Sequence, residues 1–480
     1  MESLASRRRS SPWPTLSLLL LLTSLGGLIL LDGVHTRRFQ TMTTFFNVRV
    51  DHFGYSNNHT FPLRVLYNNE YFDHSKPGPI FVYTGNEGDI APFVYNTGLL
   101  WDWAKEFGAL LVFIEHRYYG KSQPYGRDSL KNLTYFGYLT VQQALADFAQ
   151  VVSEIKRTWP GVENSKVVAF GGSYAGMLAA WLRMKYPWLV DAALTSGAPI
   201  RLYQGLVKCN AFNDAVAKAF LAEGGKQCVD NIRRSWAAFN RLQNSRAGVD
   251  FIFRKFHVCL KNVREGLSQV RDWIYGSYVN LAMHNYPYGF DVRRVASYPV
   301  RLACAFLQTN FSTDEELLSG IYDAVNVYHN DSGKVKCNDV KYVYGDYIGN
   351  AWQVQSCNEL VMPYCANGKT DLSYPFDWDS EVLTEYCQRR YGMTPDPEKF
   401  RTMFGGDKIT MASNIVFSNG DLDPWSIGGF TKSLGPSLPA VIVRGGAHLY
   451  DLRGDHPKDT NEVKRARNLE REYIKKWIGA

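Results

Sequence analysis

The sequence predicts an α/β protein in which a parallel β-sheet is covered by helices and divided by a large helical insertion. Before residue 200, strand-like apolar runs alternate with helical patterns; the runs are 79–85, 109–117, 167–170 and 192–199. This alternation is typical of parallel sheets, because a helix usually connects each strand to the next one. Strand-like runs return at 414–420 and 440–446. The sheet is therefore expected to come from two separate parts of the chain.

The stretch between these parts, residues 201–405, has helical patterns rich in Trp and Tyr and contains every cysteine of the chain: Cys209, Cys228, Cys259, Cys304, Cys337, Cys357, Cys365 and Cys387. An even count predicts disulfides in an oxidising compartment, and the absence of a C-x-x-C pair argues against zinc. We therefore predict a core of residues 37–200 and 406–480, which ends in an amphipathic helix, around a disulfide-bonded insertion.

The N-terminal segment predicts entry into the secretory pathway. A basic cluster, Arg7–Arg9, precedes an apolar run from Thr15 to Leu31. This is the pattern of a signal peptide, which we place at about residues 1–36. An uncleaved signal anchor is the alternative, because the run is little shorter than the ~20 residues that span a bilayer. Glycosylation on the same route is expected at four Asn-X-Ser/Thr sequons: Asn58, Asn132, Asn310 and Asn330.

Charge and composition exclude several classes of partner. The net charge of +7 is spread along the chain, and its only dense basic cluster lies in the signal segment, so we expect no nucleic-acid partner. No other segment is long and apolar enough to span a bilayer, so no membrane contact is expected after signal removal. We expect no metal and no cofactor. The sequence does not decide between a monomer and a homodimer.

The strongest chemical signal is Ser173, between the apolar run 167–170 and a helical pattern. A serine on so tight a strand-to-helix turn has a strained backbone, so its neighbours must be small and its hydroxyl projects above the sheet edge. The usual G-x-S-x-G pattern reads "GGSYA" at 171–175 here, with Ala in the fifth position. A glycine-rich loop with an incidental serine is the alternative interpretation.

A serine nucleophile needs a base, and the base needs an acid. In an α/β-hydrolase fold these residues follow in the chain order serine, acid, histidine, each at the carboxyl end of a strand. The two late strands end in turns that carry Asp421 and Asp423, and then His448. His456 is a rival base, but it lies further from the strand end. The order predicts a nucleophile, an acid at 421 or 423, and His448 as the base.

The oxyanion hole is expected beside the serine. One backbone N–H would come from Tyr174 and another from the loop after the early strand, at Gly85 and Asn86. Glycines in this loop allow the backbone to approach the reacting carbonyl closely. Glu87 follows directly and is a candidate substrate-binding carboxylate.

Longer blocks of sequence resemble a known family from about Phe45 to the C-terminus. "YTGNEGDI", "LVFIEHRYYGKS", "GGSYAGMLAAWLRMKYP", "NLAMHNYPY", "NIVFSNGDLDPWS" and "GGAHLYDLR" resemble the lysosomal serine peptidases that include prolylcarboxypeptidase and dipeptidyl-peptidase II. The resemblance implies an α/β-hydrolase fold with a helical cap, a Ser173–Asp423–His448 triad, and cleavage after proline. The family usually has Gly at position 175 and a second histidine at position 449, where this chain has Ala and Leu.

The resemblance also implies a proline pocket and a disulfide pairing. A pyrrolidine ring packs well on aromatic faces and thioethers, and Met177, Met362 and Trp425 match that role. Plain core packing is the alternative for these residues. The implied disulfides, which spacing alone could not give, are Cys209–Cys365, Cys228–Cys304, Cys259–Cys337 and Cys357–Cys387.

The direction of cleavage is less closely defined. "NIRRSWAAFNRL" and "VMPYCANG" resemble the carboxypeptidase branch, which implies removal of the C-terminal residue from peptides ending in Pro-Xaa, in the lysosome or outside the cell. The alternative is release of N-terminal Xaa-Pro dipeptides. A lipase or esterase of the same fold and a non-catalytic interaction protein are further alternatives. The family blocks argue against the first, and the complete set of triad residues argues against the second.

Overall fold

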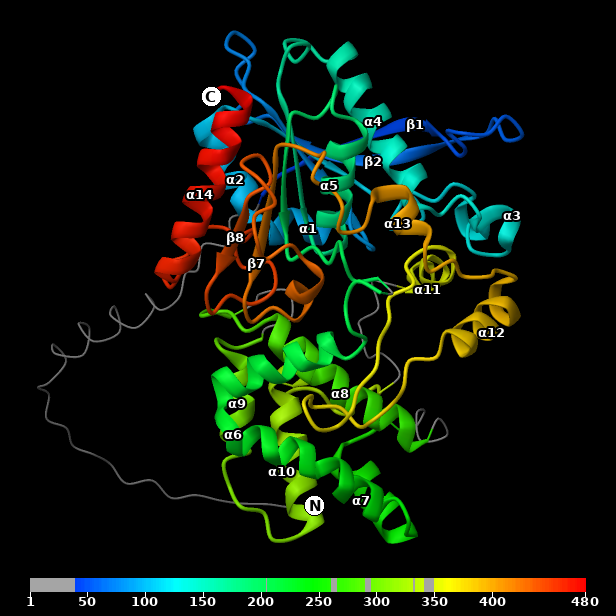
Figure 1. Cartoon of the computed structure of the whole chain (residues 1–480), viewed down its shortest axis with the longest axis vertical. Helices are drawn as coiled ribbons and strands as arrows, with labels where there is room; N and C mark the ends of the chain where they lie inside the picture. Colours follow the sequence, from blue (N-terminus) through cyan, green and yellow to red (C-terminus); the bar gives the residue numbers. More distant parts are fainter. Residues whose placement is uncertain (1–38, 204, 260–265, 290–294, 331–332, 341–348) are drawn as a thin grey trace, which may run out of the picture. The chain divides into compact units, whose positions relative to one another are not determined.

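The computed structural model describes residues 39–203, 205–259, 266–289, 295–330, 333–340 and 349–480, of which Gln40–Ala480 belong to one compact unit (Figure 1). The predicted signal peptide lies outside the described residues. No helix within the described part of the chain is long and apolar enough to cross a membrane.

An eight-stranded sheet organises this unit, in the order β1-β2-β4-β3-β5-β6-β7-β8. The last six strands along the chain form the predicted parallel part: β3 (Ile80–Thr84), β4 (Leu110–Ile114), β5 (Val167–Gly172), β6 (Ala192–Ser196), β7 (Ile415–Gly420) and β8 (Ala440–Val443). Two strands, β1 (Met42–Arg49) and β2 (Thr60–Asn68), were not predicted from the sequence. These two strands extend the sheet in antiparallel fashion.

Helices cover both faces of the sheet, and every residue of the central strands β3, β4, β5 and β6 is accordingly buried. On one face, α4 (Val141–Thr158) and α5 (Tyr174–Lys185) share a core with Val82, Val112 and Ala169. On the other face, the aromatic rings of α2 (Gly98–Phe107) contact Phe81 and Phe170. The C-terminal helix α14 (Asn461–Ile478) contacts β6, β7 and β8, and short helices α1 (Ile90–Asn96) and α3 (Leu133–Phe136) lie in the connections.

The chain between β6 and β7 is helical, as predicted. Its first part contains α6 (Ala211–Leu242), α7 (Arg246–Lys255), α8 (Leu267–Met283), α9 (Pro299–Ala305) and α10 (Asp314–His329), which pack mainly on one another (Figure 1). Its second part contains α11 (Gly349–Asn358), α12 (Ser380–Tyr391) and α13 (Lys399–Phe404). This second part packs on the sheet domain: the rings of Phe400 and Phe404 stack on Trp181 of α5, with centroids 5.0 and 4.3 Å away. The proposed boundaries at residues 201 and 405 therefore mark where the insertion begins and ends along the chain. That they also bound a separate domain stays a prediction.

All eight cysteines form disulfides, and the pairs are those that the family resemblance implied: Cys209–Cys365, Cys228–Cys304, Cys259–Cys337 and Cys357–Cys387. Every bond lies within the insertion. Two of them connect its first part internally, one connects α11 to α12, and Cys209–Cys365 joins its beginning to the segment after α11.

Candidate active site

Ser173 lies at the turn between β5 and α5, in the strained geometry that the sequence predicts. Its φ is 57° and its ψ is −127°, a region that residues other than glycine rarely adopt. The turn needs small neighbours: a Cβ on Gly171 would lie 2.1 Å from the Ala175 carbonyl oxygen, and one on Gly172 would lie 2.9 Å from the Leu449 methyls. The amide of Ser173 donates to the Ser196 carbonyl over 2.8 Å, which ties the turn to the end of β6.

Asp423 and His448 form a buried hydrogen-bonded pair. His448 Nδ1 lies 2.8 Å from Asp423 Oδ2, and the two residues are 5% and 1% exposed. Asp423 Oδ1 also accepts the amide of Trp425 over 2.9 Å, which fixes the orientation of the carboxylate. A carboxylate in this place holds the imidazole tautomer whose Nε2 can act as a base.

Gly197 brings this pair to the nucleophile turn. It directly follows Ser196, the partner of Ser173, and its φ is +53°. A Cβ at this position would lie 2.7 Å from Asp423 Oδ2 and 2.9 Å from His448 Nδ1. The Asp423–His448 pair therefore lies near the turn that carries Ser173, at the carboxyl edge of the sheet.

The rival acid and the rival base have other partners. Asp421 Oδ1 accepts the amide of Gly445 over 2.6 Å, which is turn chemistry. The ring of His456 lies 4.0 Å from that of Tyr288, and its Nδ1 accepts the amide of Lys458. Burial lowers the pKa of His456. It lines a cavity of about 570 Å³ that includes none of the three predicted triad residues.

The loop after β3 is bound to the nucleophile turn, as an oxyanion loop must be. Asn86 Nδ2 donates to the Gly172 carbonyl over 3.0 Å, and Asn86 Oδ1 accepts the Tyr83 hydroxyl over 2.6 Å. A Cβ on Gly85 would lie 2.5 Å from the Ile114 carbonyl oxygen, so only glycine fits there. Tyr174 provides the first amide of α5.

The side chain of Tyr174 connects this turn to the second part of the insertion. Gln355 Nε2 donates to its hydroxyl over 2.9 Å, and His116 Nε2 lies 3.0 Å from the same oxygen. Next to Gln355, Glu359 accepts the amide of Val141 over 2.7 Å, and burial raises its pKa to about 7. These contacts explain why α11 belongs with the sheet although it lies in the insertion.

Glu87 lies close enough to His448 for the two groups to interact electrostatically. Burial raises the pKa of Glu87, while a hydrogen bond with Asn86 and the charge of His448 act in the opposite direction. The residue as a whole is partly exposed, while its carboxyl group points away from solvent. It is therefore an acid beside the candidate base, with a proton that it holds more tightly than an ordinary glutamate does.

An aromatic cluster borders the pair. The ring of Trp425 lies 6.4 Å from that of His448 and 4.6 Å from that of Phe212, which in turn lies 6.0 Å from Tyr364. Phe212 and Tyr364 were not predicted as site residues from the sequence. Both lie within three residues of a cysteine of the Cys209–Cys365 bond, which was the only signal available.

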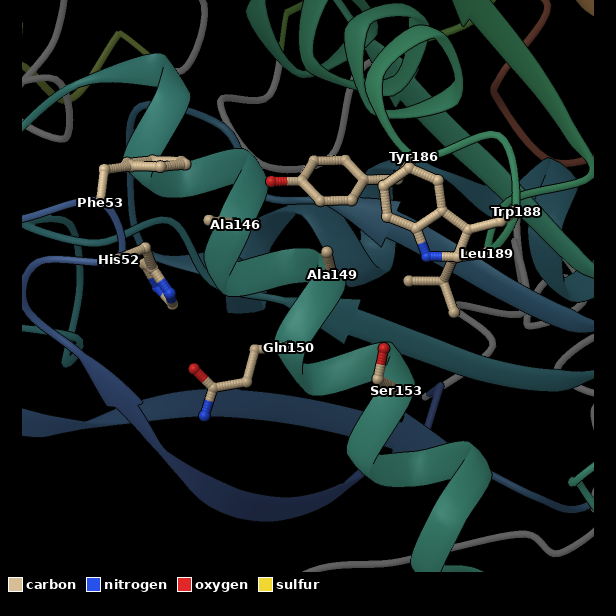
Figure 2. Close-up of a pocket in the computed structure, with 9 residues that line it drawn as sticks. All are labelled: His52, Phe53, Ala146, Ala149, Gln150, Ser153, Tyr186, Trp188 and Leu189. Carbon is tan, nitrogen blue, oxygen red and sulfur yellow. The ribbon is translucent and has the colours of Figure 1, made fainter.

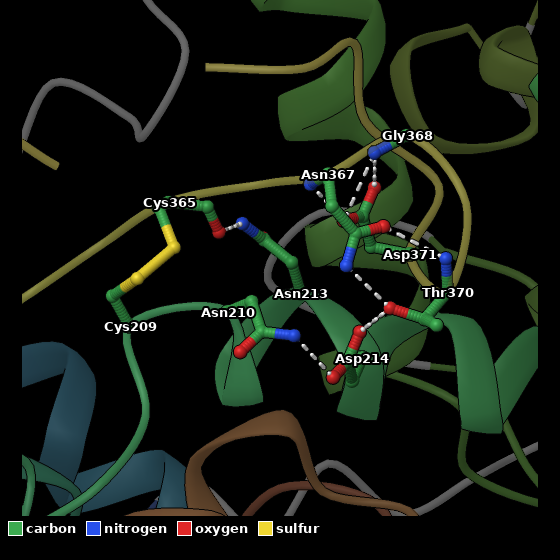
Figure 3. The surroundings of a disulfide bond; sticks show 9 residues. All are labelled: Cys209, Asn210, Asn213, Asp214, Cys365, Asn367, Gly368, Thr370 and Asp371. Atoms are coloured by element: carbon green, nitrogen blue, oxygen red, sulfur yellow. Dashed lines mark hydrogen bonds between the residues drawn. A yellow bond between two sulfur atoms is a disulfide. The ribbon is translucent and has the colours of Figure 1, made fainter. Parts of the chain in front are cut away.

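That disulfide holds the two segments of the cluster together (Figure 3). The Cys365 amide donates to the Cys209 carbonyl over 3.0 Å, and Asn213 Nδ2 donates to the Cys365 carbonyl over 2.7 Å.

The two methionines expected in a proline pocket, Met177 and Met362, lie in or against the main core of the protein. Met177 is fully buried in the main core, and Met362 packs against that core while partly exposed.

Comparisons with known proteins define the family. The family model for serine carboxypeptidase S28 matches residues 48–470. This chain belongs to the serine carboxypeptidase S28 family. It is 42% identical to the lysosomal Pro-X carboxypeptidases of Homo sapiens and Pongo abelii over 476 residues, which cover 98% of this chain and 95% of each relative. The prolyl carboxy peptidase like protein 5 of Caenorhabditis elegans is 37% identical over 90% of this chain and 89% of its own.

Membership makes the protein a serine-type peptidase with an α/β-hydrolase fold, located in the secretory pathway, in the lysosome or outside the cell. Three of the four predicted glycosylation sites of this S28 peptidase, Asn58, Asn132 and Asn310, are exposed, while Asn330 is partly buried. The catalytic and binding roles assigned to single residues stay predictions.

A cavity of about 300 Å³ lies elsewhere in the S28 peptidase, between α4 and the segments around His52 and Trp188 (Figure 2). Its lining combines exposed rings, Phe53 and Trp188, with His52, whose Nε2 lies 2.8 Å from Asp147. None of the predicted site residues lines it. This cavity is therefore separate from the candidate active site.

Proposed function

We propose that this S28 peptidase removes the C-terminal residue from peptides that end in Pro-Xaa, through a Ser173–Asp423–His448 triad. The observation that carries the proposal is the buried Asp423–His448 hydrogen bond beside the strained Ser173 turn. The names of its relatives, Pro-X carboxypeptidases at 42% identity, support the choice of substrate.

The reaction follows from these positions. Ser173 Oγ attacks the carbonyl carbon of the penultimate proline, and His448 Nε2 takes the hydroxyl proton. The backbone N–H of Tyr174 and one from the Gly85–Asn86 loop stabilise the negative oxygen. The proton then passes to the leaving amine, the C–N bond breaks, and the C-terminal residue departs. Water attacks the acyl-enzyme by the same route and releases the shortened peptide. Asp423 stabilises the imidazolium formed in each step.

Trp425, together with Phe212, Met177 and Met362, is the proposed environment of the proline ring. An aromatic face and thioethers pack on a flat, apolar pyrrolidine without needing a hydrogen-bond partner. The position of Trp425, two residues after the acid and beside the His448 ring, supports this role.

The second candidate, release of N-terminal Xaa-Pro dipeptides, is favoured by one observation, the carboxyl group of Glu87 near His448. A carboxylate could bind the ammonium group of such a substrate. However, the raised pKa of Glu87 keeps the group protonated to higher pH, and a neutral carboxyl binds an ammonium weakly. In its protonated form, Glu87 does not repel a substrate carboxylate and can donate a hydrogen bond to it.

Blocked peptides distinguish the two directions. We expect a peptide ending in Pro-Xaa to lose its last residue whether or not its N-terminus is acetylated, and to resist cleavage once its C-terminus is amidated or its proline is replaced by a bulky residue. Mass spectrometry of the products checks this. Release of a dipeptide from a free-amine Xaa-Pro substrate, with none from its acetylated form, would establish the alternative.

Ser173→Ala tests the nucleophile itself. Because triad residues act as a unit, we expect kcat to fall by ~10³ or more, with loss of labelling by a fluorophosphonate probe. Circular dichroism and secretion yield control for folding. Undiminished labelling in this variant would show that another residue is the nucleophile.

A further inference from the structure

The peptide groups of His448 are held on both sides by the insertion. The amide of His448 donates to the carbonyl of Met283, the last residue of α8, over 3.2 Å. The hydroxyl of Tyr286 donates to the His448 carbonyl over 2.5 Å. Both partners come from one short segment that is 162 or more residues away in the chain.

We propose that Tyr286 is a positioning residue for the catalytic base, so that the insertion completes the active site by fixing the backbone of His448. This inference rests on the proposed function and adds a positioning residue to the proposed active site. The base must stay within hydrogen-bonding reach of Ser173, and a displacement of about 1 Å can cost 10²-fold in rate.

The backbone around His448 needs such a restraint. The histidine lies in a loop after β8, and the next residue, Leu449, has a φ of +59° although it is not a glycine. A conformation of this kind persists only where surrounding contacts impose it. The Asp423 bond orients the ring, but it does not fix the main chain that carries the ring.

Tyr286 is well placed to impose it. The residue is 3% exposed, and its ring stacks on Tyr288 with centroids 6.1 Å apart and packs on Tyr450 at 5.9 Å. Burial raises the pKa of its hydroxyl, which therefore stays protonated and remains a donor.

The segment that carries Tyr286 is itself anchored to the start of α9. The Tyr286 carbonyl accepts the amide of Tyr298 over 2.7 Å, and Asn285 Oδ1 accepts the amide of Val300 over 3.2 Å. The segment that contacts His448 is thus held by hydrogen bonds to the start of α9 within the insertion.

Tyr286→Phe tests the inference, because it keeps the ring and removes the hydroxyl, which donates to His448 and also has a hydrogen bond with Arg453. We expect kcat to fall roughly tenfold with KM unchanged, and the rate of fluorophosphonate labelling to fall in the same ratio. A merely structural role would leave the kcat of the folded fraction unchanged.

Tyr288→Phe is the matched control. This neighbour packs in the same ring cluster, but its buried hydroxyl makes no hydrogen bond among the described residues. We expect kcat and labelling at the wild-type level. Equal losses in both variants would attribute the effect to the ring cluster and overturn the assignment to the Tyr286 hydroxyl.

Hydrogen exchange on the wild-type protein provides a measurement that does not depend on a variant. The His448 amide, bonded to Met283, should exchange at least 10²-fold more slowly than a free loop amide. Exchange at the rate of an unprotected loop would contradict the inference. Failure of the proposed function would look different: without the proposed triad the wild-type protein would lack labelling at Ser173 altogether, and with the alternative direction of cleavage it would be labelled but would release dipeptides.

Discussion

Helices α5 and α12 have the same length, twelve residues, and are held in place by different means. Ten residues of α5 are buried, against the sheet on one side and the end of the insertion on the other. In α12 the only buried residue is Cys387, which is bonded to Cys357 of α11. Close packing holds the helix that follows Ser173, whereas a covalent bond holds the peripheral one.

The difference reflects what each region must do. A packed interior leaves little free volume, so it fixes atoms to within fractions of an ångström, and residues such as Ser173 need that precision. A helix that buries one residue gains little from the hydrophobic effect and would detach readily without a cross-link. In α12 the disulfide therefore takes the place of burial, and around Ser173 close contacts supply the precision.

The largest effect should come from adding one methyl group at the packed site. In Gly197→Ala the new Cβ would meet Asp423 and His448 within 3 Å, at a φ of +53°. We expect kcat/KM on Pro-Xaa peptides to fall by 10² or more, because the acid–base pair must move away from Ser173. Steady-state kinetics and fluorophosphonate labelling measure the loss.

Gly225→Ala is the counterpart in the insertion. Gly225 also has a positive φ, +77°, at the kink of α6, but no atom lies within 4 Å of its added Cβ. The backbone strain should cost about 1–3 kcal/mol of stability and leave kcat/KM unchanged. If both alanines reduced activity equally, strain alone would explain the result and the comparison would fail.

A medium effect should follow from removing the bond that holds α12. In the double variant Cys357→Ala and Cys387→Ala, we expect a loss of about 2–4 kcal/mol in the free energy of unfolding, measured in urea, and faster proteolysis within 380–391. Catalysis should fall less than tenfold.

In the packed helix α5, Leu178→Ala should lower the free energy of unfolding by about 2–5 kcal/mol, because it leaves a cavity in the core, and it should create no new site of proteolysis. Proteolysis of α12 at the wild-type rate in the double variant would show that packing, and not the bond, holds it.

The same contrast explains how far the sequence could predict the structure. Ser173, Asp423 and His448 lie in the turns that follow apolar strands, so local patterns predicted one edge of the sheet for the site, while the choice of Asp423 over Asp421 came from the family resemblance. The contact between Tyr286 and His448 joins residues 162 positions apart through a side chain and a backbone oxygen, and no local pattern encodes it. The disulfide pairs were likewise accessible only through resemblance, because eight cysteines at these spacings allow many connectivities.

The two antiparallel strands were missed for a local reason. β2 contains Pro62, which normally argues against a strand in the middle of a sheet. In the structure, Pro62 lies opposite Asn47 of β1, in the half of β2 that does not pair with β4. The proline is thus tolerated where it has one neighbouring strand, and most of β1 is only partly buried or exposed.

The packed region also contains two acids whose environment should make stability depend on pH. Asp451 Oδ1 accepts the Ser196 hydroxyl over 2.5 Å, and Glu470 Oε1 accepts the Ser418 hydroxyl over 2.7 Å. Ser196 and Ser418 are direct neighbours on β6 and β7, so the two carboxyls lie together. Both side chains are almost completely buried.

Protonation of this pair is favoured by its surroundings. Burial raises the pKa of both carboxyls, and the negative charge of Asp451 raises that of Glu470 further. The two serine hydroxyls and the Arg467 guanidinium oppose this rise, but Arg467 Nη1 is itself bonded to Asp459 over 2.6 Å. The second oxygen of each carboxyl has no hydrogen-bond partner among the described residues, so a proton can be added there without breaking a hydrogen bond.

The smallest expected effect is therefore a pH dependence located in the packed region. Because the folded-state pKa values lie above those of the unfolded chain, the folded protein binds more protons, and its stability falls as pH rises through the raised values. We expect a lower Tm at about pH 7.5 than at about pH 5. Glu470→Gln cannot ionise, so it should reduce that difference by a few degrees. Glu385→Gln, an exposed change on α12, should leave the difference in Tm between the two pH values unchanged.

Differential scanning fluorimetry at both pH values measures Tm for the wild-type protein and the two variants. If Tm depended on pH in Glu470→Gln as it does in the wild-type protein, the dependence would come from groups other than Asp451 and Glu470. The prediction that the packed region makes stability depend on pH would then be wrong.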